Sequence, residues 1–360
     1  MAAPSKSFTV IADSSIDADS PLTEDLMTDL RDNDIHLEEW LGKDYTAATN
    51  HDHDGANSAA VGGTTGGSYI AVGHRMATGN ANLQNFCRFK PDVLFATPVD
   101  VSLSVCLKHV GDDADEVTPF TATAAKADYM IDSLVFGGAL LTASASYMSV
   151  ANQVNGYLAF KSLGSYIDYG VYAGTGASQQ ITNGFQPEVV FVWRATDGTS
   201  SGPIVKTTGM ASTTSRNITS GATTTTAIHE INSTGFKVNT SSNANSAGVD
   251  YAYLAFKSFS SQGEKIQVDT YTGTGVAKSL TNSAGFSPQA VFVINTSTTG
   301  RTIQFSLSSM YGSKSLDTTT EAVDAHVIIT EDGCDVSTNS AVNAAAETYA
   351  VIYILGGTRP

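Results

Sequence analysis

Cysteine is scarce in this chain, which argues against small proteins held together by disulfide bonds or by a zinc ion. Its three cysteines are odd in number and show no C-x-x-C spacing, which argues against both a disulfide framework and a zinc knuckle. Cys87 and Cys106 could still pair with each other, leaving Cys334 alone. We expect instead that all three are buried free thiols that pack as small apolar side chains.

Charged residues and long apolar runs are scarce as well. Charged residues make up 15% of the 360 residues, and acidic ones outnumber basic ones by 35 to 19, so the formal net charge is −16. Phosphate backbones repel such a chain, and no run of Lys and Arg offsets this, so we expect no nucleic-acid partner. No stretch reaches the roughly 18 apolar residues of a membrane span. The N-terminus MAAPSKSFTVIADSS lacks the apolar core of a signal peptide, so no secretion signal is expected.

What the chain does have is a helix-like leader, residues 1–65, ahead of a β-rich remainder. The phrase SPLTEDLMTDLRDND starts with a Ser-Pro pair, which is typical of a helix N-terminus. Leu22, Leu26 and Leu30 recur every four residues and give the helix an apolar stripe, and Trp40 follows shortly after. So short a helix cannot bury the stripe by itself. We therefore expect it to pack on a partner or on copies of itself.

After the leader the sequence repeats. Similar phrases open at Gly67 (GSYIAVGHRM), Gly164 (GSYIDYGVYA) and Gly263 (GEKIQVDTYT), at spacings of 97 and 99 residues. Each repeat then carries an aromatic residue two positions before a proline, followed by an apolar run such as VVFVW or AVFVI. The closing phrases GYLAFKS, AYLAFKS and AVIYIL also correspond.

A repeat of about 100 residues is too long for a solenoid unit and matches one β-sandwich domain. The continuous apolar runs predict strands that are buried on both faces. The expected fold class is therefore mainly β: a short N-terminal helical leader, then three tandem β-sandwich-like repeat domains, each with its own core. Their bounds are residues 66–163 (repeat 1), 164–261 (repeat 2) and 262–360 (repeat 3).

The repeats resemble a β-domain found singly or in tandem in bacteriophage tail-fibre and related virion surface proteins. Its pattern is a glycine turn, Gly-Phe-x-Pro, an apolar strand, a later Gly-Phe and a closing aromatic strand. Repeats 2 and 3 match it at Gly174, Gly176, Gly184, Phe185, Pro187, Gly235, Phe236 and Phe256, then at Gly273, Gly275, Gly285, Phe286 and Pro288. Repeat 1 departs from it, because NANLQNFCRFKPD lacks the Gly-Phe pair.

The leader phrases DSSIDADSPLTEDLMTDLRDND and HDHDGANSA are likewise similar to N-terminal segments of phage fibre-like proteins. The resemblance implies a structural virion protein, commonly a homotrimer, made in the host cytoplasm and attached to other virion proteins through its leader. A fibre or spike for host adsorption, which would contact a surface polysaccharide or receptor, is the main expectation. A head-decorating or head-fibre protein on the capsid or neck is the alternative. A cellular adhesin is disfavoured by the absence of a signal and an anchor.

The phrase HDHDG offers the best candidate site. On an extended chain His51 and His53 point to the same side. In a homotrimer, three copies of both could supply six nitrogens at the threefold axis, a set suited to Fe(II) or a similar transition metal. The alternative is a solvated turn in which Asp52, Asp54 and Gly55 supply the turn chemistry. No other cofactor is expected.

No catalytic residues are expected, so the chain is interpreted as non-enzymatic. Glu38 and Glu39 are neighbours on a helix and therefore point to different faces. The remaining candidates are dispersed over the repeats, with no shared pocket indicated: His74, His109, His229, His326, Asp168, Asp250 and Asp269. Aromatic residues that could stack on sugars, but that more often fill cores, are Tyr169, Tyr172, Trp193, Tyr271 and Tyr311.

Overall fold

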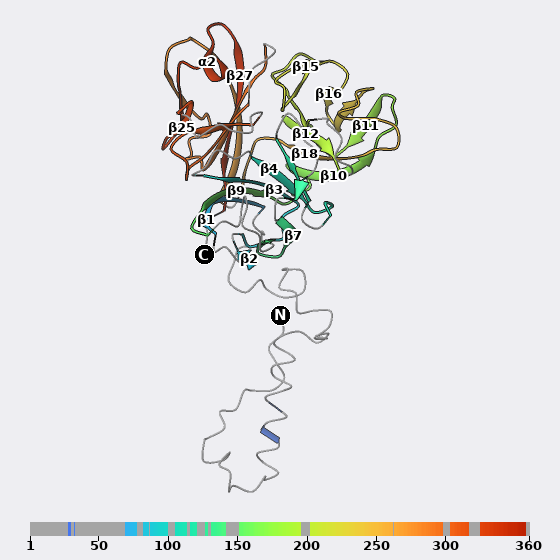
Figure 1. Cartoon of the computed structure of the whole chain (residues 1–360), viewed down its shortest axis with the longest axis vertical. Helices are drawn as coiled ribbons and strands as arrows, with labels where there is room; N and C mark the ends of the chain where they lie inside the picture. The colour runs from blue at the N-terminus through green and yellow to red at the C-terminus, as the bar shows by residue number, and fades with distance from the viewer. Residues whose placement is uncertain are drawn as a thin grey trace. The chain divides into compact units, whose positions relative to one another are not determined.

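The computed structural model describes three leader residues, Thr28, Asp29 and Asp32, and most of the remainder. The described ranges are 69–77, 82–85, 87–99, 105–113, 116–120, 127–128, 131–141, 151–195, 202–261, 263–297, 303–316 and 325–357. By compactness the chain divides into Met1–Gly66 and Gly67–Pro360, and we call the second unit the body (Figure 1). The three leader residues are helical. The stripe of Leu22, Leu26 and Leu30, and Trp40 with it, lies outside the described residues.

The body is mainly β, as the sequence predicts, and its sheets are antiparallel. Among the described residues its helix is the single turn α2 (Ser340–Asn343). No helix in the described part of the chain is long and apolar enough to cross a membrane. Repeats 1 and 2 each supply every strand of one six-stranded and one three-stranded sheet, and repeat 3 supplies a three-stranded sheet and five strands of a six-stranded one.

In repeat 1 the six-stranded sheet runs β1-β9-β3-β4-β5-β6 and the three-stranded sheet runs β2-β8-β7. The bounds are β1 (Ile70–Met76), β2 (Asn82–Asn85), β3 (Val93–Pro98), β4 (Cys106–His109), β5 (Glu116–Pro119), β6 (Ala127–Asp128), β7 (Ile131–Val135), β8 (Gly138–Leu141) and β9 (Val154–Phe160).

In repeat 2 the orders are β10-β18-β12-β13-β14-β15 and β11-β17-β16. The bounds are β10 (Ile167–Ala173), β11 (Gln179–Thr182), β12 (Val189–Arg194), β13 (Ile204–Thr207), β14 (Ser215–Asn217), β15 (Thr223–Thr224), β16 (Ile228–Asn232), β17 (Gly235–Val238) and β18 (Asp250–Phe256).

In repeat 3 the orders are β19-β20-β27-β22-β23-β24 and β21-β26-β25, so the last strand of the preceding repeat joins this sheet. The bounds are β19 (Phe259–Ser261), β20 (Glu264–Thr272), β21 (Lys278–Thr281), β22 (Ala290–Asn295), β23 (Gln304–Leu307), β24 (Ser313–Ser315), β25 (Val327–Ile329), β26 (Gly333–Val336) and β27 (Thr348–Leu355).

The apolar runs form central strands buried on both faces, as predicted. In β12 the run Val189–Trp193 is buried throughout, and in β22 so is the run Ala290–Ile294. Successive side chains of a strand point to opposite faces of its sheet. Odd positions of β12, such as Phe191, therefore enter one apolar cluster, while even positions, such as Val190, enter another.

Each repeat has an apolar cluster of its own on one face of its six-stranded sheet. In repeat 2 this inner cluster joins Val190 and Tyr253 of that sheet to Ile181, Ile228 and Phe236 of the three-stranded sheet. The corresponding clusters of repeats 1 and 3 likewise contain residues of both their sheets. The three-stranded sheet thus covers one face of its six-stranded partner.

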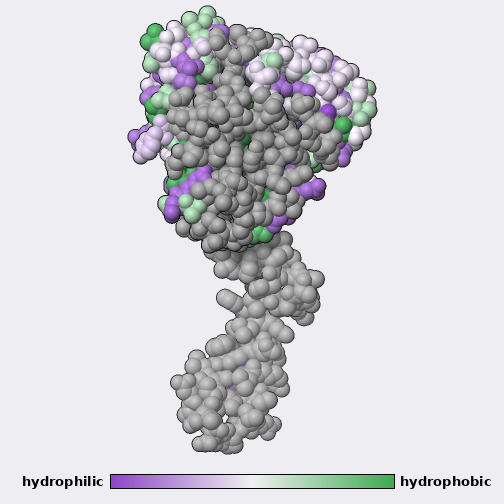
Figure 2. All heavy atoms as spheres, in the orientation of Figure 1, coloured by the Kyte–Doolittle hydropathy of each residue, from purple (hydrophilic) through white to green (hydrophobic). Residues whose placement is uncertain are grey.

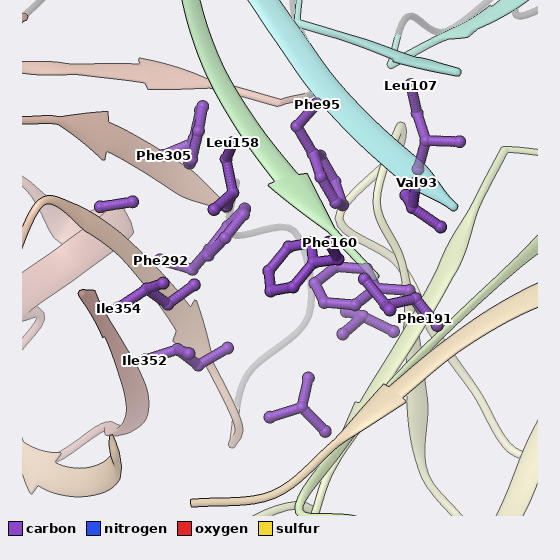
Figure 3. Close-up of a cluster of buried hydrophobic side chains, with 14 of the residues drawn as sticks. Val93, Phe95, Leu107, Leu158, Phe160, Phe191, Phe292, Phe305, Ile352 and Ile354 are labelled. Carbon is purple, nitrogen blue, oxygen red and sulfur yellow. The ribbon is translucent and has the colours of Figure 1, made fainter. Parts of the chain in front are cut away.

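The opposite faces of the three large sheets meet in one further cluster, which we call the shared core (Figure 3). Its centre is Phe95, Phe191 and Phe292, the third residues of β3, β12 and β22, with ring centroids 5.7–5.9 Å apart. The same cluster takes in the aliphatic residues opposite them on the neighbouring strands: Leu158, Leu254 and Ile352. The cores expected to be independent are therefore joined, because each large sheet has a second apolar face.

The glycine turns of the repeated motif are fixed by buried asparagines. Gly176 and Gly275 have φ angles of +70° and +74°, a region that favours glycine. The side-chain oxygen of Asn245, which is fully buried, accepts the N–H of Thr175 at 2.8 Å. Asn343 does the same for the corresponding turn of repeat 3. The motif at these positions is explained by backbone geometry.

The exposed large hydrophobic residues of the described chain come from different segments of the sequence: Met76, Val110, Phe136, Tyr166, Val171, Val276, Tyr311 and Ile328. On the face visible in Figure 2 the coloured hydrophobic residues lie among hydrophilic ones. The three cysteines are free thiols, with Cys106 and Cys334 buried and Cys87 partly so, as expected.

Candidate functional site

A polar pocket lies at the Phe185-Gln186-Pro187 motif of repeat 2. Its cavity volume is about 430 Å³, and it is lined by Gln186, Pro187, Glu188, Thr208, Lys257 and Ser258. These residues come from the segments before β12, after β13 and after β18, which are brought together because the three strands are neighbours in one sheet. The volume falls within the range of small-ligand pockets.

The local sequence explains how the wall of the pocket is held. Gly184, with a φ of +81°, turns the chain so that Phe185 is 5% exposed and its ring anchors the loop. The ammonium of Lys257 lies 5.0 Å from the ring centre of Tyr166 and 5.3 Å from that of Phe185. Such contacts attract a cation to the electron-rich ring face.

The carboxylate of Glu188 holds the closing strand of its repeat. Its Oε2 accepts the N–H of Ser258 at 2.5 Å. The same bond recurs at the corresponding positions of the other repeats, from Ser162 to Asp92 at 2.8 Å and from Gly356 to Gln289 at 3.1 Å. Because a neutral amide replaces the carboxylate in repeat 3, the bond serves the fold and does not require the charge.

The lysine also has a counterpart in repeat 3, reached from another strand. There the Lys265 ammonium lies 5.4 Å from the ring centre of Phe286. Covering the buried phenylalanine is thus a repeated structural task. The pocket of repeat 2 combines hydroxyl, amide, ammonium and carboxylate groups, which can form hydrogen bonds with a polar ligand.

His109 lies in a buried network of polar side chains. Its Nε2 lies 2.8 Å from the Oδ1 of Asp112, and its Nδ1 lies 2.8 Å from the hydroxyl of Tyr169 in repeat 2. The N–H of Gly111 also points at Nδ1, at 3.1 Å. Burial, then the charges of Asp112 and Asp92, raise the pKa of Tyr169 far above its usual value.

This network is a joint between repeats 1 and 2. The side chains of His109 and Asp112 are 1% and 0% exposed, so no substrate reaches them. The His109 ring also packs in a T-shaped arrangement with Trp193 of the shared core, with ring centres 5.7 Å apart. An acid–histidine pair needs access to a reacting atom to act as a general base. This one supports packing.

The other candidates from the sequence are not brought together. His326 contacts Asn339 at 2.9 Å, and His229 makes one long contact at 3.5 Å. Asp168 accepts the hydroxyl of Tyr253 at 2.7 Å, and Asp269 accepts that of Ser283 at 2.6 Å. These partners lie within the same repeat in each case, and they give the carboxylates structural tasks.

Among the aromatic candidates, Trp193 and Tyr172 are core residues, as the more common interpretation predicts. Tyr169 and Tyr271 are partly buried, and Tyr311 is 97% exposed. Tyr166 contacts Lys257, a residue of the pocket, and packs against Phe259. Sequence reasoning missed this pocket, because its residues are adjacent only through the sheet.

No group of three or more metal-ligating side chains occurs among the described residues. His51 and His53 lie outside them, so the metal site stays a prediction. Purified full-length protein should carry about one transition-metal ion per three chains, and replacing both histidines by alanine should remove it, since neutral imidazoles are the ligands. Elemental analysis of chelator-free protein measures the ratio. A metal-free chain would leave the two histidines as turn residues.

Lys206 of β13 gives a pH prediction. It is 2% exposed and donates to the carbonyl of Ala211 at 2.9 Å, and burial lowers its pKa to about 8. Between about pH 8 and pH 10.5 the unfolded chain binds the proton and the folded chain does not, so this group makes unfolding costlier as pH rises. The free energy of unfolding of the Lys206→Met variant minus that of the natural chain should therefore decrease across that range, by at most about 3 kcal/mol. Denaturant titrations at several pH values measure it, and a constant difference would contradict it.

No protein-family model and no curated protein matches the chain.

Proposed function

We propose that the chain is a non-enzymatic structural protein of a bacteriophage virion, a fibre or spike component that presents β-domains for host adsorption. In this proposal each repeat is a β-sandwich-like domain, the leader attaches the chain to other virion proteins, and the chain forms a homotrimer. The observation that carries it is the architecture: a separate N-terminal unit precedes a body of three β repeats built to one plan.

Two further observations support a binding role over an enzymatic one. The His–Asp pair of the described residues is buried in a joint between repeats, where no substrate can reach it. The described pocket contains polar groups suited to hydrogen bonds with a sugar or another polar receptor group.

Electron microscopy of phage particles labelled with antibodies against residues 67–360 tests the proposal. We expect the label on fibres or spikes of the tail, and label on the capsid or neck would favour the head-attached alternative. Particles without label would overturn the virion assignment. Purified body, added in excess to host cells, should also slow adsorption of the phage, and an unrelated acidic β-protein at the same concentration serves as the control.

A further inference from the structure

The shared core has the geometry of an interface between three subunits. Phe95, Phe191 and Phe292 occupy the same register position in their sheets and contact one another pairwise. Each repeat also contributes neighbouring residues to the cluster, among them Phe160, Phe256 and Ile354 at the ends of the closing strands. Each large sheet therefore buries one face within its repeat and the other against both further repeats.

Equivalent polar contacts run from repeat 2 to repeat 3 and from repeat 3 to repeat 1. Arg216 of repeat 2 and Lys314 of repeat 3 hold the same register position, each opposite a shared-core residue of the neighbouring strand. Arg216 is 1% exposed and donates to Asn295, the last residue of β22, at 3.4 Å. Lys314 donates to the carbonyl of Pro98, the last residue of β3. Repeat 2 thus contacts repeat 3 in the way that repeat 3 contacts repeat 1.

Repeats 3 and 1 also contact each other, although no peptide bond joins them directly, and we call this contact the seam. At the first junction Leu163 donates its N–H to the carbonyl of Ile167 at 2.6 Å, and at the second Phe259 pairs with Ile266. At the seam Gly357 donates to the carbonyl of Ile70 at 3.0 Å. Ile70, Ile167 and Ile266 hold the same register position in their strands, opposite Phe160, Phe256 and Ile354, so the seam repeats the contact that the covalent junctions make.

A buried carboxylate strengthens the seam. Glu264, which is 3% exposed, accepts the N–H of Tyr69 at 2.9 Å and that of Ile70 at 3.2 Å. Gly356 approaches so closely that a Cβ there would lie 2.8 Å from the backbone nitrogen of Val72. The start of repeat 1 is therefore fitted against both the first strand and the end of repeat 3.

We propose that the three repeats of the body form a ring with pseudo-threefold symmetry, in which they associate as three separate subunits of a trimer would. The large-sheet face of each repeat is an association surface whose partners are the two other copies of the same repeat, and the seam closes the ring. A homotrimer of the whole chain must then use another surface, because these faces are already occupied. The proposal holds whether or not the protein belongs to a virion.

Cutting the covalent junctions of the full-length chain tests the ring. Protease sites fit between Gly164 and Ser165, in an exposed turn, and directly before Gly263, which is also exposed. A Cβ at either of these glycines would meet no atom within 4 Å, so there is room for an insertion. The uncut variants should melt at the temperature of the natural chain, and each site can be tested alone.

After complete cleavage, light scattering during size-exclusion chromatography should give the mass of the uncut protein, while denaturing gels show separate fragments. Fragments that elute apart would overturn the proposal, because independent tandem domains separate once their linkers are cut. A matched pair of variants localises the interface. Phe191→Ala, in the shared core, should make the cut protein dissociate at more than tenfold higher concentration than the cut parent. Its neighbour Val190→Ala, in the inner cluster, should not, and equal effects of the two would also overturn the proposal.

Discussion

Replacing Phe95 by alanine is expected to lower the free energy of unfolding of the entire body by about 3–5 kcal/mol. The ring of Phe95 is fully buried and is the centre of the shared core. Its contacts include the rings of Phe191 and Phe292 in the other repeats, at 5.9 and 5.7 Å between ring centres. The cavity left by the substitution would face all three large sheets, so the loss is shared by all of them.

Calorimetry and hydrogen exchange together measure this result. One cooperative transition at a lower temperature is expected, and amide protection should fall in β12 and β22 as well as in β3. Phe236→Ala is the matched control, because Phe236 is equally buried but belongs to the inner cluster of repeat 2. Its effect on protection should be confined mainly to that repeat. A Phe95→Ala chain in which repeat 1 alone melts early would show that the three cores act independently.

The repeats and their central strands could be predicted from the sequence because both depend on local patterns. The Phe-x-Pro phrases recur at nearly constant spacing, and Phe185 and Phe286 are buried at 5% and 6% exposure, as their positions in the motif imply. The run VVFVW indicates a strand covered on both faces. It does not indicate what covers each face, and the second cover proves to be the other repeats.

The contacts of the candidate sites depend on residues far apart in sequence, so no local pattern predicts them. His109 and Tyr169 are 60 positions apart and meet only because repeats 1 and 2 share a core. Lys257 and Phe185 meet because β12 and β18 are neighbours in the sheet. The aromatic candidates show the same limit: Trp193 is buried in the shared core while Tyr311 is exposed, and the residue type alone does not distinguish them.

Deleting residues 1–45 is expected to abolish incorporation into phage particles while leaving the body folded. The deletion removes the proposed helix with its stripe of Leu22, Leu26 and Leu30, together with Trp40. A short amphipathic helix must bury such a stripe on a partner, and the proposed partner is another virion protein or a sister leader. The body should keep its fold because the chain divides into compact units after Gly66.

Immunoblots of purified particles measure incorporation, and circular dichroism of the purified chain measures folding. The full-length chain with His51 and His53 both replaced by alanine is a useful comparison, because it alters the leader without removing the proposed helix. If the helix attaches the chain, the histidine variant should enter particles at more than half the normal amount, whereas the truncated chain falls below detection. A truncated chain present at normal occupancy would mean that attachment lies after residue 45, in the rest of the leader or in the body, and not in the proposed helix.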